Sequence, residues 1–237
     1  MHLFYYPEIK GNTFTLDKTE SAHCIKVLRL STGDIIHLTN GAGKLFMAKI
    51  IKPDKKACTS EILEVYDIPK KENSYLHIGI APTKNIERFE WFLEKATEIG
   101  TDKFTPLLCN NSERRIIKEL RLQKVIISAM KQSLKAWLPE IAPLTAFENF
   151  VNRDFIGSKY IATCSAPQEN HIGKIHKKNT NSLILIGPEG DFRKEEVEMA
   201  LDKGYIPVSL GESRLRTETA GLVACHSINF INSVTRT

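Results

Sequence analysis

The segment that most constrains the fold of this chain is residues 183–229, which contains two successive units of strand, glycine turn and helix. Residues 183–186 form a short, continuous apolar run, a pattern typical of a strand buried on both faces of a parallel sheet. The glycines and proline of residues 187–190 (GPEG) predict a sharp turn directly after it. We expect Asp191 to cap the next helix, which ends near Lys203.

The second unit repeats this order, with a strand over residues 206–210 that ends at Gly211. The final helix follows the motif of residues 215–220 (LRTETA), and its predicted buried stripe is Ala220, Val223, Ala224 and Ile228. Glycine turns at the carboxyl ends of two adjacent strands predict the ligand crevice of an open α/β sheet.

The turn sequences also restrict the ligand. A dinucleotide site would have G-x-G-x-x-G after a strand, and a triphosphate site would have a glycine loop ending in Gly-Lys-Ser/Thr; the sequence contains neither. Glu189 places an acid where a phosphate would lie, which disfavours a phosphate ligand. A compact cationic or zwitterionic cofactor fits this crevice better.

Composition sets wider bounds. The chain has 237 residues, 42% of them apolar and 26% charged, as expected for a globular protein of one large or two smaller domains. A net charge of +5 is compatible with a polyanionic partner. We find no signal-peptide core and no apolar run of membrane-spanning length, so we expect a cytoplasmic protein. The five scattered cysteines favour reduced thiols, and the histidines, with His171 and His176 five apart and His226 expected in a helix core, predict no metal site.

The first seventy residues differ in pattern from the rest. We expect strands at residues 2–6, 35–38, 44–51 and 57–65, and one short helix at residues 17–29. Asn40-Gly41-Ala42-Gly43 is a hairpin signal. Short strands with tight turns predict a small β-barrel, and the charged, proline-led stretch of residues 69–73 is the best linker candidate.

Beyond the linker, strands and helices alternate. The predicted strands are residues 76–81, 103–108 and 160–163, and the predicted helices are residues 85–99 and 118–135. This alternation predicts a parallel α/β sheet covered on both faces. The fold class is therefore α/β, with a small N-terminal β-barrel and a C-terminal parallel sheet.

Several motifs together resemble the RsmE-type 16S rRNA (uracil-N3) methyltransferases of the SPOUT superfamily. In chain order they are His23 with Val27-Leu28-Arg29, Gly33-Asp34, residues 84–100 (KNIERFEWFLEKATEIG), Ser112-Glu113-Arg114, residues 186–190 (IGPEG), and Leu210-Gly211 with residues 215–220. The resemblance implies a PUA-like RNA-binding domain at residues 1–70 and a methyltransferase domain with a trefoil knot at residues 74–237. It also implies a homodimer that uses S-adenosyl-L-methionine.

The resemblance assigns the cofactor site to positions around the two glycine turns and the strand before them. The residues are Thr163, Ile186, Gly187, Glu189, Gly190, Leu210, Gly211, Leu215 and Thr217. The chain departs from the family pattern at Asp191, where a second glycine is usual, and at residues 131–135. We expect the turn to survive because Asp191 can cap a helix.

Methyl transfer to N3 of uracil requires loss of the N3 proton, hence a base or a cation that stabilises the resulting anion. Arg216 is the candidate for holding that charge, and Glu218 is either the base or a group that orients Arg216. The alternative is that Arg216 and Glu218 form a purely structural ion pair. Basic candidates for RNA contact are Lys26, Arg29, Lys84, Arg88, Arg114 and Arg115.

The predicted function is methylation of one uridine in small-subunit (16S) rRNA, with the assembled subunit as the expected substrate. Two alternatives stay open: a catalytically silent RNA-binding protein of the same fold, and a small-molecule α/β enzyme. The N-terminal barrel disfavours the small-molecule enzyme, and the intact residues 215–220 disfavour the silent protein.

Overall fold

A computed structural model describes residues 2–70, 72 and 74–234 of the chain. The chain divides into two compact units, Met1–Lys70 with Ile127–Leu138, and Lys71–Ile126 with Pro139–Thr237. The predicted linker at residues 69–73 includes Lys71 and Asn73, which lie outside the described residues. No helix in the described ranges is long and apolar enough to cross a membrane.

The first unit is built on a five-stranded sheet in the order β1-β3-β4-β5-β2. Its strands are β1 Leu3–Tyr5, β2 Thr13–Thr15, β3 Ile35–Thr39, β4 Lys44–Lys52 and β5 Thr59–Asp67. β3 and β4 form the predicted antiparallel hairpin. The sheet encloses a core that includes Phe4, Phe14, Leu38 and Ile50, and burial of each such side chain stabilises the fold by roughly 1.5–3 kcal/mol.

One helical segment covers this sheet. α1, Lys18–Ala22, begins at Asp17, whose carboxylate accepts hydrogen bonds from the backbone N–H groups of Thr19 and Glu20. It continues as the π-helical turn η1, His23–Val27. The predicted helix over residues 17–29 therefore ends early, because Arg29 adopts a left-handed conformation with φ of 57°.

Residues 127–138 complete the first unit from a distant part of the chain. The backbone N–H of Gly43 donates to Ala136, and that of Leu138 donates to Gly41. Gly43 has a φ of 90°, and a Cβ there would lie 2.3 Å from the Trp137 ring, so only glycine fits. The hairpin turn is thus a docking point for Trp137.

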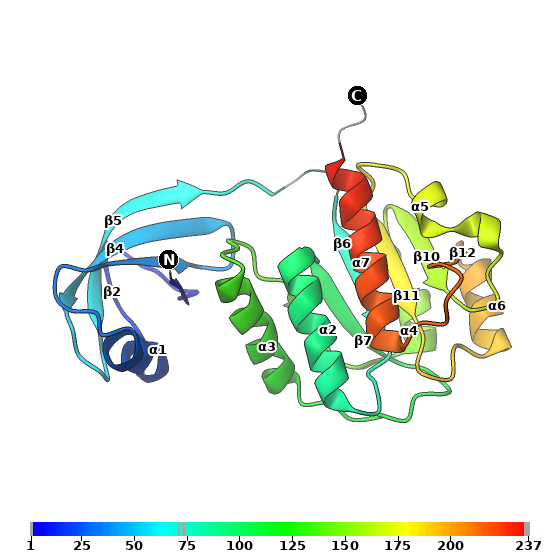
Figure 1. Ribbon diagram of the computed structural model, residues 1–237, viewed down its shortest axis with the longest axis horizontal. Helices are drawn as coiled ribbons and strands as arrows, with labels where there is room; N and C mark the ends of the chain where they lie inside the picture. Colours follow the sequence, from blue (N-terminus) through cyan, green and yellow to red (C-terminus); the bar gives the residue numbers. More distant parts are fainter. Residues whose placement is uncertain (1, 71, 73, 235–237) are drawn as a thin grey trace. The chain divides into compact units, whose positions relative to one another are not determined.

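The second unit contains a parallel sheet in the order β12-β10-β11-β6-β7-β8, with β9 paired to β7 (Figure 1). Its strands are β6 Leu76–Ile80, β7 Lys103–Leu108, β8 Glu140–Ile141, β9 Thr145–Ala146, β10 Ser158–Ala162, β11 Ser182–Ile186 and β12 Ile206–Val208. β6 and β11 are buried along their whole length, which confirms the predicted parallel sheet.

Helices alternate with these strands along the chain. They are α2 Ile86–Ile99, α3 Glu119–Gln132, α4 Phe147–Val151, α5 Ile172–Ile175, α6 Lys194–Asp202 and α7 Thr217–Ser233, with the short 3₁₀ helix η2 at Gln168–Asn170. Of these, α3 runs from the second unit into the first. α2 and α7 lie side by side on one face (Figure 1), and α4 and α6 pack against the buried side chains of the other. In α7 the predicted stripe is partly wrong: Ala224 and Ile228 are buried, but Ala220 and Val223 are only half-buried.

The described fold confirms the α/β class with a small N-terminal sheet and a C-terminal parallel sheet. α3 is shorter than predicted, since it ends at Gln132 rather than at Lys135. Leu134, which follows, has a left-handed φ of 56° that a helix does not allow. The trefoil knot and the functional domain boundaries stay predictions.

Candidate functional site

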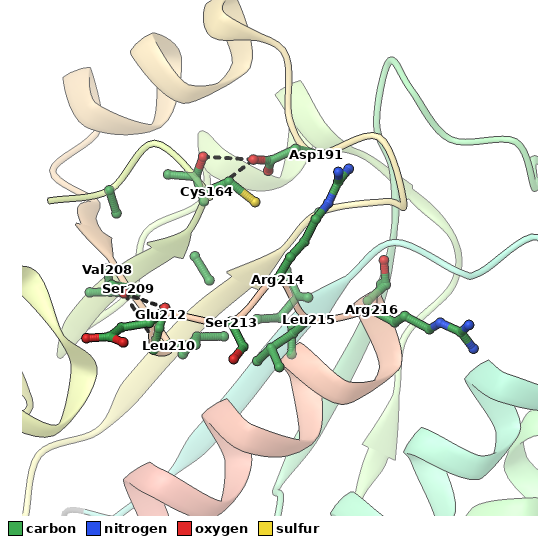
Figure 2. A pocket seen from close by; sticks show the side chains of 18 of the residues that line it. Cys164, Asp191, Val208, Ser209, Leu210, Glu212, Ser213, Arg214, Leu215 and Arg216 are labelled. Atoms are coloured by element: carbon green, nitrogen blue, oxygen red, sulfur yellow. Dashed lines mark hydrogen bonds between the residues drawn. The ribbon is translucent and has the colours of Figure 1, made fainter. Parts of the chain in front are cut away.

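A cavity of about 570 Å³ lies at the carboxyl ends of β10, β11 and β12 (Figure 2). Each strand is followed by a loop that forms one wall. The sequence predicted that the two glycine turns follow adjacent strands, and this was wrong, because β10 lies between β11 and β12. The loop after β10 is therefore the middle wall of the cavity.

The wall after β11 is a tight turn. The backbone N–H of Asp191 donates to the carbonyl of Pro188 at 2.9 Å, and Asp191 takes a left-handed φ of 61°. A Cβ at Gly187 would lie 3.1 Å from the ring of Phe192, so this position also favours glycine. The predicted turn is therefore formed, although aspartate rather than glycine occupies its left-handed position.

Asp191 does not cap the following helix, contrary to the sequence prediction. α6 begins at Lys194, with Arg193 as its N-cap and Glu196 accepting a hydrogen bond from the Arg193 backbone N–H at 2.9 Å. Asp191 lies two residues before that cap, in a left-handed conformation.

The Asp191 carboxylate instead joins two walls. Oδ2 accepts hydrogen bonds from the Thr163 hydroxyl at 3.1 Å and from the backbone N–H of Cys164 at 3.0 Å, both on the loop after β10 (Figure 2). Oδ1 accepts from the backbone N–H of Phe192 at 2.8 Å. One side chain thus fixes the spacing between the β10 and β11 loops.

A second network supports the turn from behind. Glu196 is only 4% exposed, and its other carboxylate oxygen accepts from the backbone N–H of Asn110 at 2.9 Å. The Asn111 amide donates to the carbonyls of Gly190 and Asp191. The loop after β7 therefore anchors both the turn and the start of α6.

Glu189 and the β6–α2 loop form a further contact at the cavity. The Glu189 carboxylate accepts from the backbone N–H of Lys84 at 2.8 Å. The Lys84 ammonium lies 2.8 Å from Glu113, which raises the pKa of Lys84 through a hydrogen bond and charge attraction. Arg114 donates to the carbonyls of Thr83 and Lys84. Lys84 and Arg114, both predicted to contact RNA, are thus engaged within the protein.

The wall after β12 comprises the segment of residues 209–217. Gly211 has a φ of 128°, a conformation that side chains rarely adopt. Ser209 closes this bend, since its hydroxyl accepts from the Gly211 N–H at 3.2 Å. The side chains of Arg214 and Arg216 leave this segment in different directions (Figure 2).

Most predicted cofactor residues line this one cavity. They are Thr163, Ile186, Gly187, Glu189, Leu210, Gly211, Leu215 and Thr217. Gly190 lies beside it, behind the turn and close to Asn111. Arg216 also lines the cavity and is exposed at the N-cap of α7.

Glu218 is placed differently from Arg216. It is only 7% exposed and is not among the residues lining the cavity, and its Oε1 lies 3.9 Å from Nε of Arg88 on α2. Within the described ranges, Oε2 has no hydrogen-bond partner and no ion pair joins Glu218 to Arg216. The structural Arg216–Glu218 pair considered from the sequence is therefore not formed in this part of the chain.

Other predicted positions are dispersed. Lys26, Arg29 and Arg115 are exposed. His226 was expected in the helix core, but it is exposed and lies against Phe230. His77 and His176 are buried instead, and His176 contacts Tyr160 and Asn232. In the described part of the chain, no group of three or more His, Cys, Asp or Glu side chains could hold a metal ion.

Sequence analysis missed several residues that shape the cavity. Cys164, Gln168, Ser209 and Arg214 line it, and Asn111 and Glu196 hold its turn. The thiol of Cys164 is exposed, and partial burial together with the neighbouring Asp191 raises its pKa. Cys164 and Ser209 could have been found from the sequence, because each lies just after the end of a strand. The contacts of Asn111 and Glu196 could not, because no local sequence pattern indicates them.

Comparison with known proteins identifies the family of this chain. The profile of the RNA methyltransferase domain matches residues 70–229, and that of the RNA methyltransferase PUA domain matches residues 16–63. The ribosomal RNA small subunit methyltransferase E of Synechocystis sp. is 30% identical over 227 residues, covering 92% of this chain and 73% of the relative. The chain belongs to this RNA methyltransferase family.

Solved structures of the same family share the whole fold. A probable rRNA-methyltransferase from Porphyromonas gingivalis is 42% identical, with a TM-score of 0.92 and coverage of 98% of this chain and 99% of that one. A putative methyltransferase from Legionella pneumophila, solved with bound S-adenosylmethionine, is 27% identical, with a TM-score of 0.86 and coverage of 96% of each chain. The resemblance to the RsmE-type methyltransferases is thereby confirmed.

Proposed function

We propose that this protein methylates N3 of a specific uridine in 16S rRNA, with S-adenosyl-L-methionine as the methyl donor. The observation that carries this function is the single cavity that gathers eight of the nine predicted cofactor residues together with Arg216. Family membership and the cofactor bound to the Legionella relative support the donor and the class of reaction. The N3 specificity comes from the resemblance to the uracil-N3 enzymes.

The cavity suits a zwitterionic sulfonium compound. Carboxylates of Glu189, Asp191 and Glu212 lie in its walls, and Ile186, Val208, Leu210 and Leu215 supply apolar surface. Acidic groups favour a cationic ligand and disfavour a phosphate, and apolar groups accommodate an adenosyl ring. When bound, S-adenosyl-L-methionine supplies a methyl group on a positively charged sulfur, a good leaving group.

The protein's own contribution is to position groups and to stabilise charge. Arg216 is exposed and lines the cavity, and we propose that its guanidinium stabilises the negative charge that develops on the uracil ring. Asp191 and Glu189 hold the loops that shape the cavity through backbone hydrogen bonds. Arg216 is therefore our proposed catalytic residue.

Glu218 retains two proposed roles. It acts either as the acceptor of the N3 proton or as a positioning group, and its burial beside Arg88 favours positioning. A Glu218→Gln variant separates these roles. Loss of the acidic limb of the pH–rate profile would identify the base, whereas an unchanged profile with a lower kcat would identify a positioning group.

The wider assignment follows the family. We propose residues 1–70 as the RNA-binding domain and residues 74–237 as the methyltransferase domain, in a homodimer that acts in the cytoplasm on the small ribosomal subunit. The PUA-domain match over residues 16–63 supports the RNA-binding role.

The deciding experiment is nucleoside mass spectrometry after incubation of the protein and S-adenosyl-L-methionine with small subunits that lack the modification. We expect 3-methyluridine, and we expect Arg216→Gln to lower kcat by about 10²–10³-fold without weakening cofactor binding. Arg153→Gln is the matched control, because Arg153 is exposed and precedes the amino end of β10. Cofactor binding without any product on subunits or naked rRNA would favour the silent RNA-binding protein. Product formed only on a small molecule would favour the small-molecule α/β enzyme.

A further inference from the structure

Four lysines converge in the first unit at a place separate from the cofactor cavity. Lys18 and Lys26 come from α1 and η1, and Lys55 and Lys56 come from the turn between β4 and β5. Together with Thr19 and Ala22 they line a surface hollow of about 440 Å³. We call these four side chains the lysine cluster.

The positive charges of the lysine cluster are not neutralised by ion pairs. In the described part of the chain, no salt bridge involves any of the four lysines, and all four are exposed. Two nearby acids are engaged elsewhere: Asp17 accepts from the backbone of α1, and Glu20 pairs with Lys131. Asp54 accepts from the backbone N–H of Lys56 and forms no salt bridge with the Lys56 ammonium in the described part of the chain. The hollow therefore presents ammonium groups to solvent.

The two segments that carry these lysines are held together by a buried contact. Ser21 is fully buried in α1; its hydroxyl donates to the carbonyl of Leu16 at 2.9 Å and accepts from the backbone N–H of Cys58 at 2.9 Å. Cys58 immediately precedes β5, and Cys24 packs in the same core. Segments whose lysines lie 29 to 38 residues apart in sequence are thus held in one arrangement, which lowers the entropy lost when they bind a common ligand.

We propose that the lysine cluster binds the phosphate backbone of the RNA substrate. The inference rests on the proposed function and adds the surface that holds the RNA. Several cations around one hollow match a run of phosphates, each contact releasing counterions. Lysine is a compact point charge without a planar fork, so the cluster holds RNA but does not select bases. Of the sequence-predicted pair in this unit, only Lys26 belongs to it; Arg29 does not line the hollow.

The test compares the full-length protein with a variant in which Lys18, Lys26, Lys55 and Lys56 are all changed to Gln. Binding to a fluorescein-labelled single-stranded rRNA fragment is followed by anisotropy over a series of KCl concentrations. The plot of log K against log[KCl] has a negative slope, and we expect its magnitude to decrease by about 3 in the variant. Each of the four phosphate contacts on a single strand contributes about 0.7. Affinity should fall by at least about 10-fold, and the KM for small subunits should rise while kcat is retained.

A charge-matched control separates a local site from net charge. In the control variant, Lys124, Lys174, Lys177 and Lys203 are changed to Gln. This removes the same charge from four exposed positions of the second unit. We expect it to retain nearly the wild-type slope. Equal losses of RNA affinity in both variants would overturn the proposal. Binding to anionic lipid vesicles is measured in parallel, and a cluster variant that loses vesicle binding but keeps its RNA affinity would also overturn it.

Two further measurements keep this inference distinct from the proposed function. Unchanged S-adenosyl-L-methionine affinity and thermal unfolding in the cluster variant would show that the variant is folded. Wild-type methylation of subunits, combined with an unchanged RNA KM in the cluster variant, would refute the RNA surface alone. Absence of wild-type methylation, combined with a smaller salt slope in the variant, would refute the activity and leave the RNA surface supported.

Discussion

The carboxylate of Asp191 accepts a hydrogen bond from the hydroxyl of Thr163 at 3.1 Å, and this contact joins the loops after β11 and β10 at the proposed cofactor cavity. Asp191 makes this contact from a left-handed backbone conformation, with a φ of 61°. The same residue therefore combines a strained conformation with hydrogen bonds that hold the cavity together.

Substitutions at Asp191 separate these two effects. Asp191→Ala keeps the left-handed strain and removes the carboxylate, so we expect the free energy of unfolding to fall by about 2–3 kcal/mol. Asp191→Gly also removes the carboxylate but relieves the strain, so it should recover about 1 kcal/mol. Both should weaken S-adenosyl-L-methionine binding. Urea unfolding and calorimetric titration measure these effects, and a glycine variant less stable than the alanine variant would contradict the explanation.

Glu196 should be far more sensitive than its neighbour Glu195. Glu196→Gln replaces one carboxylate oxygen by an NH₂ group that faces a backbone N–H of Asn110 or Arg193, so we expect a loss of about 1–3 kcal/mol. Glu195 is exposed in the same turn of α6, and Glu195→Gln should stay within about 0.5 kcal/mol of the wild type. Equal effects in chemical denaturation would show that the buried contacts contribute little.

His77 predicts a pH dependence of stability. It is 8% exposed on β6 and hydrogen-bonded to Thr105 at 2.8 Å, and burial, assisted by Lys103 and Arg153, lowers its pKa from 6.5 to about 3. Below pH 6.5 the unfolded chain takes up a proton that the folded chain does not. The free energy of unfolding should therefore fall by about 1.4 kcal/mol per pH unit from pH 6.5 toward 3.

The matched variant for this effect is His77→Gln, which can still bond Thr105 but does not titrate. Its stability should depend less steeply on pH between about 6.5 and 3 than that of the wild type. A residual slope is expected, because burial also lowers the pKa of His176. Denaturant midpoints measured across this range give the difference, and parallel curves for the two proteins would exclude His77 as the source.

Gly221 lets α7 pack closely against α2 and the sheet. A Cβ there would lie 2.6 Å from the Phe92 ring and 2.8 Å from Ile80. We expect Gly221→Ala to destabilise the protein by about 1–2 kcal/mol, since overpacking outweighs the better helix propensity of alanine. Adding Phe92→Leu should restore part of this loss in a double-mutant cycle, whereas additive losses would place the strain elsewhere.

Local signals predicted much of the fold. The β3–β4 hairpin follows from Asn40-Gly41-Ala42-Gly43, and α2 follows from its apolar stripe between Asn85 and Gly100. Elements of three to five residues, such as β2 and α4, were missed because they contain too few residues to show a period. The order of strands was also beyond sequence, since the position of β10 between β11 and β12 depends on packing.

The site was predictable where function depends on position after a strand, as for Gly187 and Gly211. It was not predictable where a side chain acts across the fold: Asn111 reaches Gly190 over 79 residues, and Glu196 reaches Asn110 over 86. Asp191 was assigned the wrong role because an aspartate before a helix ordinarily caps it. No local sequence pattern predicts its left-handed backbone. In that conformation the carboxylate bonds to Thr163 and Cys164 instead.

The division of α3 affects how the chain is made. The helix begins at Glu119 in the second unit, but its residues from Ile127 onward belong to the first unit, together with the Trp137 segment that docks on Gly43. A nascent chain that has emerged only as far as Lys70 lacks part of its own packing partner. The N-terminal unit therefore cannot be completed during synthesis until Leu138 has left the ribosome, which requires that more than half of the 237 residues have been translated.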